Sequence, residues 1–320
     1  LAHIFKSRTG EAIASLLEDE APEDPLASAC IVPISASGTK TPLFCVHCGR
    51  GRVHHYVKFA RELEPERPVY ALQPPGMDGR RALSVRVEMF AERYLDEIRT
   101  IQHTGPYVLC GYSFGGLIAV EIARRLIERG ESVEALYIVD TSLPRRDQPT
   151  TSWRTHRDRL ASLDWSGRAS YITEKLLGNV RSLTHSMRMA ARHYSSVYRS
   201  SARVTCGGAI STEQQGDYFY YRFMKEAQAH YKPRPYAGDV VLFRATRADW
   251  SDRDRHALGW DAVAGGELKI VDIEGNHTTV MSPGNAREIA RTIREHLGAR
   301  HEIARGSLNA RELAFTPDAP

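Results

Sequence analysis

The chain has 320 residues and a formal net charge of +4, and 42% of its residues are hydrophobic and 26% charged. These fractions are ordinary for a globular protein, and no apolar run approaches the roughly 20 residues that cross a membrane, so we expect neither a transmembrane segment nor a membrane partner. Five scattered cysteines without metal-ligand spacing, and a first segment without a secretory pattern, favour a reducing, cytoplasmic setting.

The first forty residues differ in composition from the rest. Residues 1–20 have helical apolar spacing, with Ile13, Leu16 and Leu17 on one side. Residues 21–40 are rich in Pro, Ser and Gly, which is typical of a linker. We therefore expect one main domain over residues 41–300, followed by a loosely held tail at 301–320.

Short apolar strands alternate with amphipathic helices from residue 41 onward. We expect strands at 43–47, 69–72, 107–110, 135–139, 240–244 and 268–271, and helices at 56–63, 85–101, 114–129 and 285–297. The strands are apolar throughout, as in a parallel sheet that is covered on both faces. The order predicts an α/β fold with a mostly parallel sheet flanked by helices.

The alternation stops after Pro144, and residues 145–236 show helix-like apolar spacing without a convincing strand. An insertion of this size after a strand predicts a helical lid over the site. Between Arg145 and Arg203 the chain has twelve basic and four acidic residues, a net charge of +8. An acidic protein partner or an anionic substrate group fits this charge better than nucleic acid, because no nucleic-acid motif accompanies it. A solvated helical face remains the simple alternative.

The most informative motif lies between the strand at 107–110 and the helix at 114–129. It reads Gly111-Tyr112-Ser113-Phe114-Gly115, a G-x-S-x-G pattern in a strand–turn–helix setting. Small residues are needed two positions either side of the serine because the turn is tight, and Gly116 lets the new helix pack closely on the sheet. The helix N-terminus favours negative charge at the serine. The motif predicts the nucleophile elbow of an α/β-hydrolase, with Ser113 as the nucleophile.

A serine hydroxyl needs a base to take its proton and an acid to orient that base. In this fold the order along the chain is serine, acid, histidine, and His277 follows the last strand, so we expect it to be the base. Two acids compete. Asp140 ends the strand at 135–139, whereas Asp249 stands further beyond the strand at 240–244. We favour Asp140 because the end of a strand is rigid, and Asp249 stays as the alternative.

An oxyanion hole needs two backbone N–H groups directed at the developing charge. One is expected from Phe114, the residue after the nucleophile. The other is expected from the loop after the first core strand, His47-Cys48-Gly49-Arg50-Gly51, where glycine allows the backbone to approach a substrate closely.

Four segments together resemble the type I thioesterase domains that end nonribosomal peptide synthetases and polyketide synthases. They are the strand Thr41–His47, the segment Arg67–Gly76, the elbow at Gly105–Gly116 and the loop Gly275-Asn276-His277. The resemblance covers roughly 41–298. It implies an α/β-hydrolase core with a lid after the strand that ends in the acid, which favours Asp140, although Asp249 matches related stand-alone thioesterases. It also implies a substrate carried on the phosphopantetheine of an upstream carrier domain, and residues 1–20 resemble the last helix of such a domain.

The loop after the first strand departs from the family pattern His-Pro-x-Gly-Gly. Proline has no N–H, so the family's donor must come from the next position, which is Gly49 here rather than Cys48. Cys48 is interpreted as a simple proline replacement rather than a second reactive thiol. Arg50 replaces a glycine, and with Arg52, His54 and His55 it predicts a polar entrance. Arg50 would meet a substrate carboxylate or the pantetheine phosphate, or else face solvent.

The sequence thus predicts a serine thioesterase that needs no cofactor or metal of its own. Its partners would be an upstream carrier domain and a small-molecule acyl or peptidyl substrate. Two other functions stay open. One is a stand-alone serine esterase on the same fold, and the other is a non-catalytic module that only binds a partner.

Overall fold

The computed structural model describes residues 30–63, 67–74, 86–144, 164, 216–217, 219–247 and 256–313. The expected helix at 1–20, most of the expected lid and the alternative acid Asp249 lie outside these residues. In the part that is described, no helix is both long enough and apolar enough to cross a membrane.

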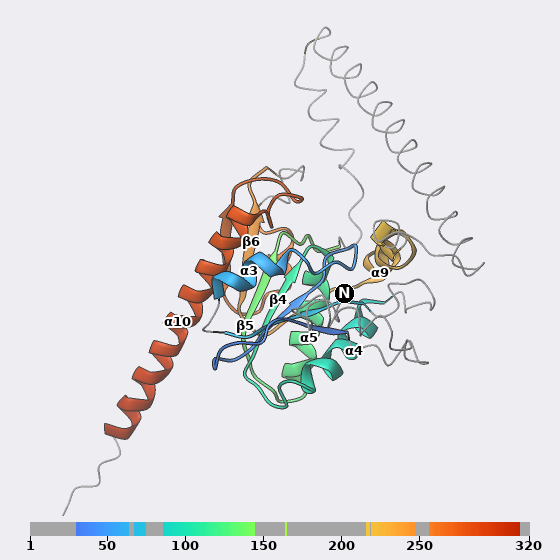
Figure 1. Cartoon of the computed structure of the whole chain (residues 1–320). Helices are drawn as coiled ribbons and strands as arrows, with labels where there is room; N and C mark the ends of the chain where they lie inside the picture. The colour runs from blue at the N-terminus through green and yellow to red at the C-terminus, as the bar shows by residue number, and fades with distance from the viewer. Residues whose placement is uncertain are drawn as a thin grey trace, which may run out of the picture.

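One seven-stranded sheet forms the centre of the molecule (Figure 1). Its spatial order is β1-β3-β2-β4-β5-β6-β7, and every neighbouring pair is parallel except β1 with β3. The strands are β1 (Ile31–Ser35), β2 (Leu43–Val46), β3 (Val69–Leu72), β4 (Tyr107–Tyr112), β5 (Val133–Val139), β6 (Val240–Ala245) and β7 (Leu268–Ile273). Because parallel strands share one carboxyl edge, the segments that follow β2, β4, β5 and β7 meet at the same side of the sheet.

Helices cover both faces of the sheet (Figure 1). On one face the core contains side chains of α3 (Tyr56–Leu63) and α10 (Pro283–Leu313), and on the other those of α4 (Val87–Arg99) and α5 (Phe114–Glu128). Shorter helices are η2 (Tyr220–Met224), α9 (Lys225–His230) and η3 (Trp260–Ala262). Along β2, Phe44 and Val46 join the α4–α5 side, whereas Leu43 and Cys45 join the α3–α10 side, which is the two-residue period of a strand.

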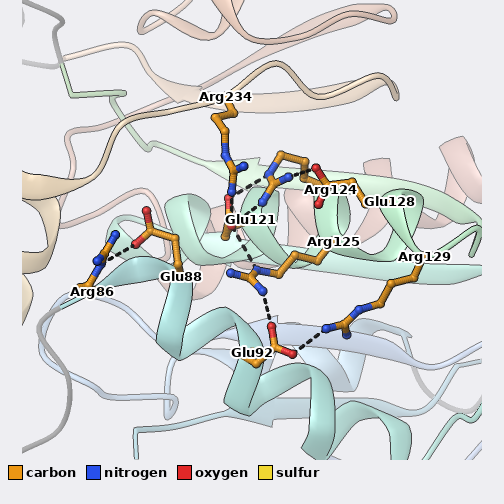
Figure 2. Close-up of polar contacts among 9 residues, drawn as sticks. All are labelled: Arg86, Glu88, Glu92, Glu121, Arg124, Arg125, Glu128, Arg129 and Arg234. Atoms are coloured by element: carbon orange, nitrogen blue, oxygen red, sulfur yellow. Dashed lines mark hydrogen bonds and ion pairs between the residues drawn. The ribbon is translucent and has the colours of Figure 1, made fainter.

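A buried carboxylate ties α5 to its surroundings (Figure 2). Glu121 is 1% exposed and accepts hydrogen bonds from Arg124 (2.7 Å), Arg125 (3.1 Å) and Arg234 (3.4 Å). Arg125 also pairs with Glu92 of α4. A buried charge is tolerated only when it is paired, so this network fixes α5 against α4 and against the segment that precedes β6.

The structure departs from the sequence-based expectations at both ends. Residues 31–35, which we assigned to a linker, form β1 at the edge of the sheet. Pro33 interrupts the run, and an edge strand tolerates a residue without an N–H. The final helix, expected to end at 297, continues through residues 298–313 into the expected tail. Within the described residues, the other expected strands and helices are confirmed to within a few residues, and Cys45 and Cys110 are buried in the core as expected.

Candidate active site

Ser113 lies in a sharp turn between the end of β4 and the start of α5. Its backbone has φ 57° and ψ −126°, a left-handed conformation that is unfavourable for a side chain other than glycine. The turn exists because its neighbours are small. A Cβ on Gly111 would lie 2.3 Å from the carbonyl oxygen of Gly115, and a Cβ on Gly115 would lie 2.4 Å from that of His47. The two glycines flanking the serine thus pack against backbone, as the motif predicts.

Gly116 also packs where no side chain fits. A Cβ at this position would lie 2.2 Å from Oγ1 of Thr141, and that hydroxyl donates a 2.6 Å hydrogen bond to the carbonyl oxygen of Ser113. The Ser113 amide donates to the carbonyl of Val139 (2.9 Å). The end of β5 and the residues just after it therefore hold the backbone of Ser113 through two hydrogen bonds. The sequence analysis did not identify the contact that Thr141 makes.

Ser113, His277 and Asp140 form one hydrogen-bonded line. Ser113 Oγ lies 2.9 Å from His277 Nε2, and His277 Nδ1 lies 2.7 Å from Asp140 Oδ2. An ionised carboxylate only accepts hydrogen bonds, so Nδ1 carries the proton and Nε2 is left to accept from the serine hydroxyl. The residues are far apart in sequence, and the shared carboxyl edge of β4, β5 and β7 brings them together.

Asp140 is fully buried just beyond β5, in a backbone conformation with φ 45°. Its amide donates to the carbonyl of Phe243 (2.7 Å), and its Oδ1 accepts from the amide of Ala245 (3.0 Å). Both partners belong to β6, so the neighbouring strand holds the backbone and one carboxylate oxygen while the other oxygen faces His277. The alternative acid, Asp249, lies outside the described residues.

The loop that carries His277 is held by its own side chains and by β4. Asn276 Oδ1 accepts from the amides of Thr278 and Thr279 (3.1 Å each), and Gly275 has φ 114°, which favours glycine. Tyr112 donates its hydroxyl to the carbonyl oxygen of His277 (2.6 Å), and the two rings are 5.6 Å apart. Tyr112 is the residue before the nucleophile, and sequence reasoning did not assign it this contact.

The two expected oxyanion donors lie beside each other. The amide of Phe114 is the first of α5 and has no acceptor within the helix. A Cβ on Gly49 would lie 3.9 Å from Cβ of Phe114 and 3.1 Å from the ring of Tyr220, so the backbone at Gly49 reaches the start of α5. The Cys48 amide, in contrast, donates to the carbonyl of Arg52 (3.3 Å) and is engaged inside its own loop.

His47 fixes the peptide group that precedes Gly49. Its Nδ1 lies 2.7 Å from the carbonyl oxygen of Cys48, which also accepts from the amide of Gly51 (2.8 Å). The C=O and N–H of a trans peptide point in opposite directions, so the N–H of Gly49 is held on the opposite side. The His47 ring is fully buried against Phe90, and burial lowers its pKa to about 4, so it stays neutral.

Arg50 in the same loop forms a 2.6 Å ion pair with Asp217, and 44% of its side chain is exposed. It therefore faces solvent, as one expectation had it, and its contact with a substrate carboxylate or phosphate stays a prediction. The partner belongs to the segment expected to form the lid, a contact that sequence spacing cannot reveal. Burial raises the pKa of the Cys48 thiol, which agrees with a proline replacement rather than a reactive thiol. In the described part of the chain, no group of His, Cys, Asp and Glu residues is arranged to hold a metal.

Comparisons with known proteins concern most of the chain. A family model described as "Thioesterase domain" matches residues 41–297. Malpibaldin synthetase of Mortierella alpina is 29% identical over 276 residues, which cover 83% of this chain and 4% of that protein. Inactive atromentin synthetase invA4 of Paxillus involutus is 29% identical over 284 residues, which cover 84% of this chain and 28% of that protein. The chain thus spans a minor part of the length of these curated relatives.

A solved structure of the NocB thioesterase domain from the nocardicin cluster matches with a TM-score of 0.57 at 23% identity. The match covers 85% of this chain and 100% of that one. At this identity the likeness concerns the fold, and it agrees with the expected α/β-hydrolase architecture.

Proposed function

Because the chain belongs to the thioesterase domain family, we propose that it is a terminal thioesterase, which takes an acyl or peptidyl chain from a phosphopantetheine carrier onto Ser113 and releases it. The observation that supports this most directly is the line from Ser113 Oγ through His277 to Asp140. In this proposal Ser113 is the nucleophile, His277 is the base, and Asp140 holds the base in its tautomer.

The first half-reaction forms an ester on the serine. Ser113 Oγ attacks the thioester carbonyl carbon while its proton passes to His277 Nε2, which is 2.9 Å away. The carbonyl oxygen becomes an oxyanion, for which the amides of Phe114 and Gly49 are the proposed donors. When the tetrahedral intermediate collapses, the carbon–sulfur bond breaks and the leaving thiolate takes the proton from His277.

The second half-reaction releases the chain. His277 takes a proton from an acceptor, the acceptor oxygen or nitrogen attacks the ester carbonyl, and the bond to Ser113 breaks as its Oγ recovers a proton. Water as acceptor gives a free acid, whereas a hydroxyl or amine of the bound chain gives a ring. The lid would set the balance by excluding water, and it lies mostly outside the described residues.

The proposed partners follow from this chemistry. The phosphopantetheine arm belongs to the carrier domain, and the chain needs no cofactor of its own for acyl transfer to a serine. The relatives' names describe synthetases, which agrees with a domain that acts on carrier-bound intermediates.

Intact-mass measurement of the acyl-enzyme tests the proposal. Wild type, Ser113→Ala and the exposed control Ser37→Ala would each be incubated with an acyl-pantetheine thioester. We expect wild type and the control to gain the mass of the acyl group or to release free acid, and Ser113→Ala to do neither. An acyl adduct that persists on Ser113→Ala would refute the mechanism.

The same assay separates the two other functions. A stand-alone esterase would turn over simple oxygen esters faster than pantetheine thioesters. A non-catalytic module would show neither adduct nor product across acyl groups. The assay must include this outcome because one relative is named an inactive synthetase.

A further inference from the structure

The ring of Tyr220 packs directly on the backbone of Gly49, the second expected oxyanion donor. A Cβ added to Gly49 would lie 3.1 Å from both Cδ2 and Cε2 of this ring, and 3.9 Å from Cβ of Phe114. The ring therefore occupies the space that a side chain would fill at this position, and the first residue of α5 borders the same space. Tyr220 itself is partly buried and packs against the core.

Two further contacts hold the segment of this ring against the loop. Asp217 forms the 2.6 Å ion pair with Arg50, which is the residue after Gly49. Phe219 is 2% exposed, and its ring lies 5.9 Å from that of His47 in an edge-to-face arrangement. The segment thus contacts the loop on both sides of the glycine, although the two are remote from each other in sequence.

The helix η2, which begins at Tyr220, is a single turn of π-helix. The amide of Lys225 donates to the carbonyl oxygen of Tyr220, five residues earlier. Such turns are rare and occur frequently at functional sites. Phe219 and Tyr220 stand at the start of the turn, and they contact two different residues of the loop, His47 and Gly49.

An oxyanion donor is effective only when its N–H is directed at the developing charge before the reaction begins. Glycine has the freest backbone of all residues, so a donor on glycine needs restraints from outside. His47 restrains the peptide group that precedes Gly49. We propose that Tyr220 is a positioning residue, which restrains Gly49 at its α-carbon and keeps its N–H directed at the oxyanion. This inference rests on the proposed function and deepens it, because it names what holds the second donor of the same site.

The ion pair gives a supporting part to Arg50, which replaces a glycine of the family pattern. The side chains of Arg50 and Asp217 are 44% and 20% exposed, and a partly solvated pair contributes little by itself. It holds the segment of Tyr220 close to the loop. Loss of the pair should therefore act in the same direction as loss of the ring, but more weakly.

Exchange of the substrate's carbonyl oxygen for sulfur tests the proposal. Hexanoyl-pantetheine and dithiohexanoyl-pantetheine differ only in this atom, and sulfur is the weaker acceptor of hydrogen bonds. The rate of thiol release is measured for both probes, and the oxygen-to-sulfur ratio does not depend on how much of a preparation is folded. We expect this ratio to fall about tenfold in Tyr220→Ala, a part of the 10²- to 10³-fold that loss of one donor costs. A role in folding or in substrate binding would lower both rates and leave the ratio unchanged.

Three matched variants complete the series. Tyr220→Phe keeps the ring edge that contacts Gly49, so it should keep the wild-type ratio. Arg50→Gln should lower the ratio about two- to fivefold on its own. It should not lower the ratio further in Tyr220→Ala, because the pair acts through the ring. Arg287→Gln removes the exposed ion pair with Glu62, and as the control it should leave the ratio unchanged.

An equal ratio in wild type and Tyr220→Ala would overturn the proposal, even if both rates fall. So would a Tyr220→Phe variant with the ratio of Tyr220→Ala, because the ring edge would then not be what restrains Gly49. If the wild type releases thiol from neither probe, the proposed function fails and this inference fails with it. If the wild type acts on both probes with a ratio that no variant changes, the proposed function stands and the inference alone fails.

Discussion

At the scale of single residues, Asp140 is held from two directions. One carboxylate oxygen accepts from the Ala245 amide and the other faces Nδ1 of His277. In Asp140→Asn the amide oxygen would keep the Ala245 contact, and the NH₂ group would then face His277. An NH₂ group cannot accept from Nδ1–H, so the ring would carry its proton on Nε2 and could not take one from Ser113.

We therefore predict that Asp140→Asn lowers kcat for thioester hydrolysis by about 10³- to 10⁴-fold and leaves the fold in place. Steady-state kinetics and circular dichroism measure the two properties. Asp249→Asn is the matched variant, because Asp249 is the competing acid of the sequence analysis. If Asp249→Asn lost activity and Asp140→Asn kept it, the roles of the two acids would be reversed.

The sequence predicted that Ser113, His277 and Asp140 come together, and the structure brings them within hydrogen-bond distance, because each follows a strand whose position in this fold is fixed. It could not find Tyr112 and Thr141 as supports, since their hydroxyls reach the carbonyls of His277 and Ser113 only after β4 and β5 pair. The pairing of Arg50 with Asp217 is of the same kind. It depends on how the segment before η2 packs, and no local pattern encodes that.

At the scale of elements, α5 approaches the sheet so closely that its first turn leaves no space for a methyl group. A Cβ on Gly115 would lie 2.4 Å and 2.6 Å from the carbonyl oxygens of His47 and Val46, and these are backbone atoms that cannot rotate away. We predict that Gly115→Ala lowers the free energy of unfolding by about 1–3 kcal/mol, as overpacking does, and also shifts the elbow.

Gly298→Ala is the matched control for this change. Gly298 lies within α10 with no atom within 4 Å of the added Cβ, so alanine should stabilise the protein by about 0.5–1 kcal/mol through helix propensity. Urea unfolding of both variants against wild type measures the difference. Equal effects would mean that the close approach of α5 does not constrain the fold.

The elements themselves were predictable where the apolar pattern is long or sharply bounded. The helix Tyr56–Leu63 and the strand Val69–Leu72 were expected with the bounds that the structure shows. The strand Ile31–Ser35 was missed because it is short, contains Pro33 and lies among linker-like residues. This segment is a strand because it pairs antiparallel with β3, whose residues are remote from it in sequence.

At the scale of the whole molecule, the buried His47 and the partly buried His55 make stability depend on pH. Burial lowers the pKa of His47 to about 4 and that of His55 to about 3, whereas an unfolded histidine has a pKa near 6.5. Below pH 6.5 the unfolded chain therefore binds protons that the folded chain does not. The stabilisation is fully present above pH 6.5 and is lost progressively as the pH falls toward the folded pKa values.

We predict that the free energy of unfolding falls between pH 7 and pH 5, and that His47 accounts for about 2 kcal/mol of the fall. Urea unfolding at the two pH values measures it in wild type, in His47→Phe and in the exposed control His103→Gln. The fall should be smaller by at least this amount in His47→Phe and unchanged in the control, whatever the absolute stability of each variant. Removing His47 also removes a charge that lowers the pKa of His55, so the His55 contribution falls in the same direction. An equal fall in all three proteins would mean that His47 is protonated in the folded protein over this pH range. The hydrogen bond from its Nδ1–H to the carbonyl of Cys48, in the loop that carries the proposed oxyanion donor, would then not require a neutral ring.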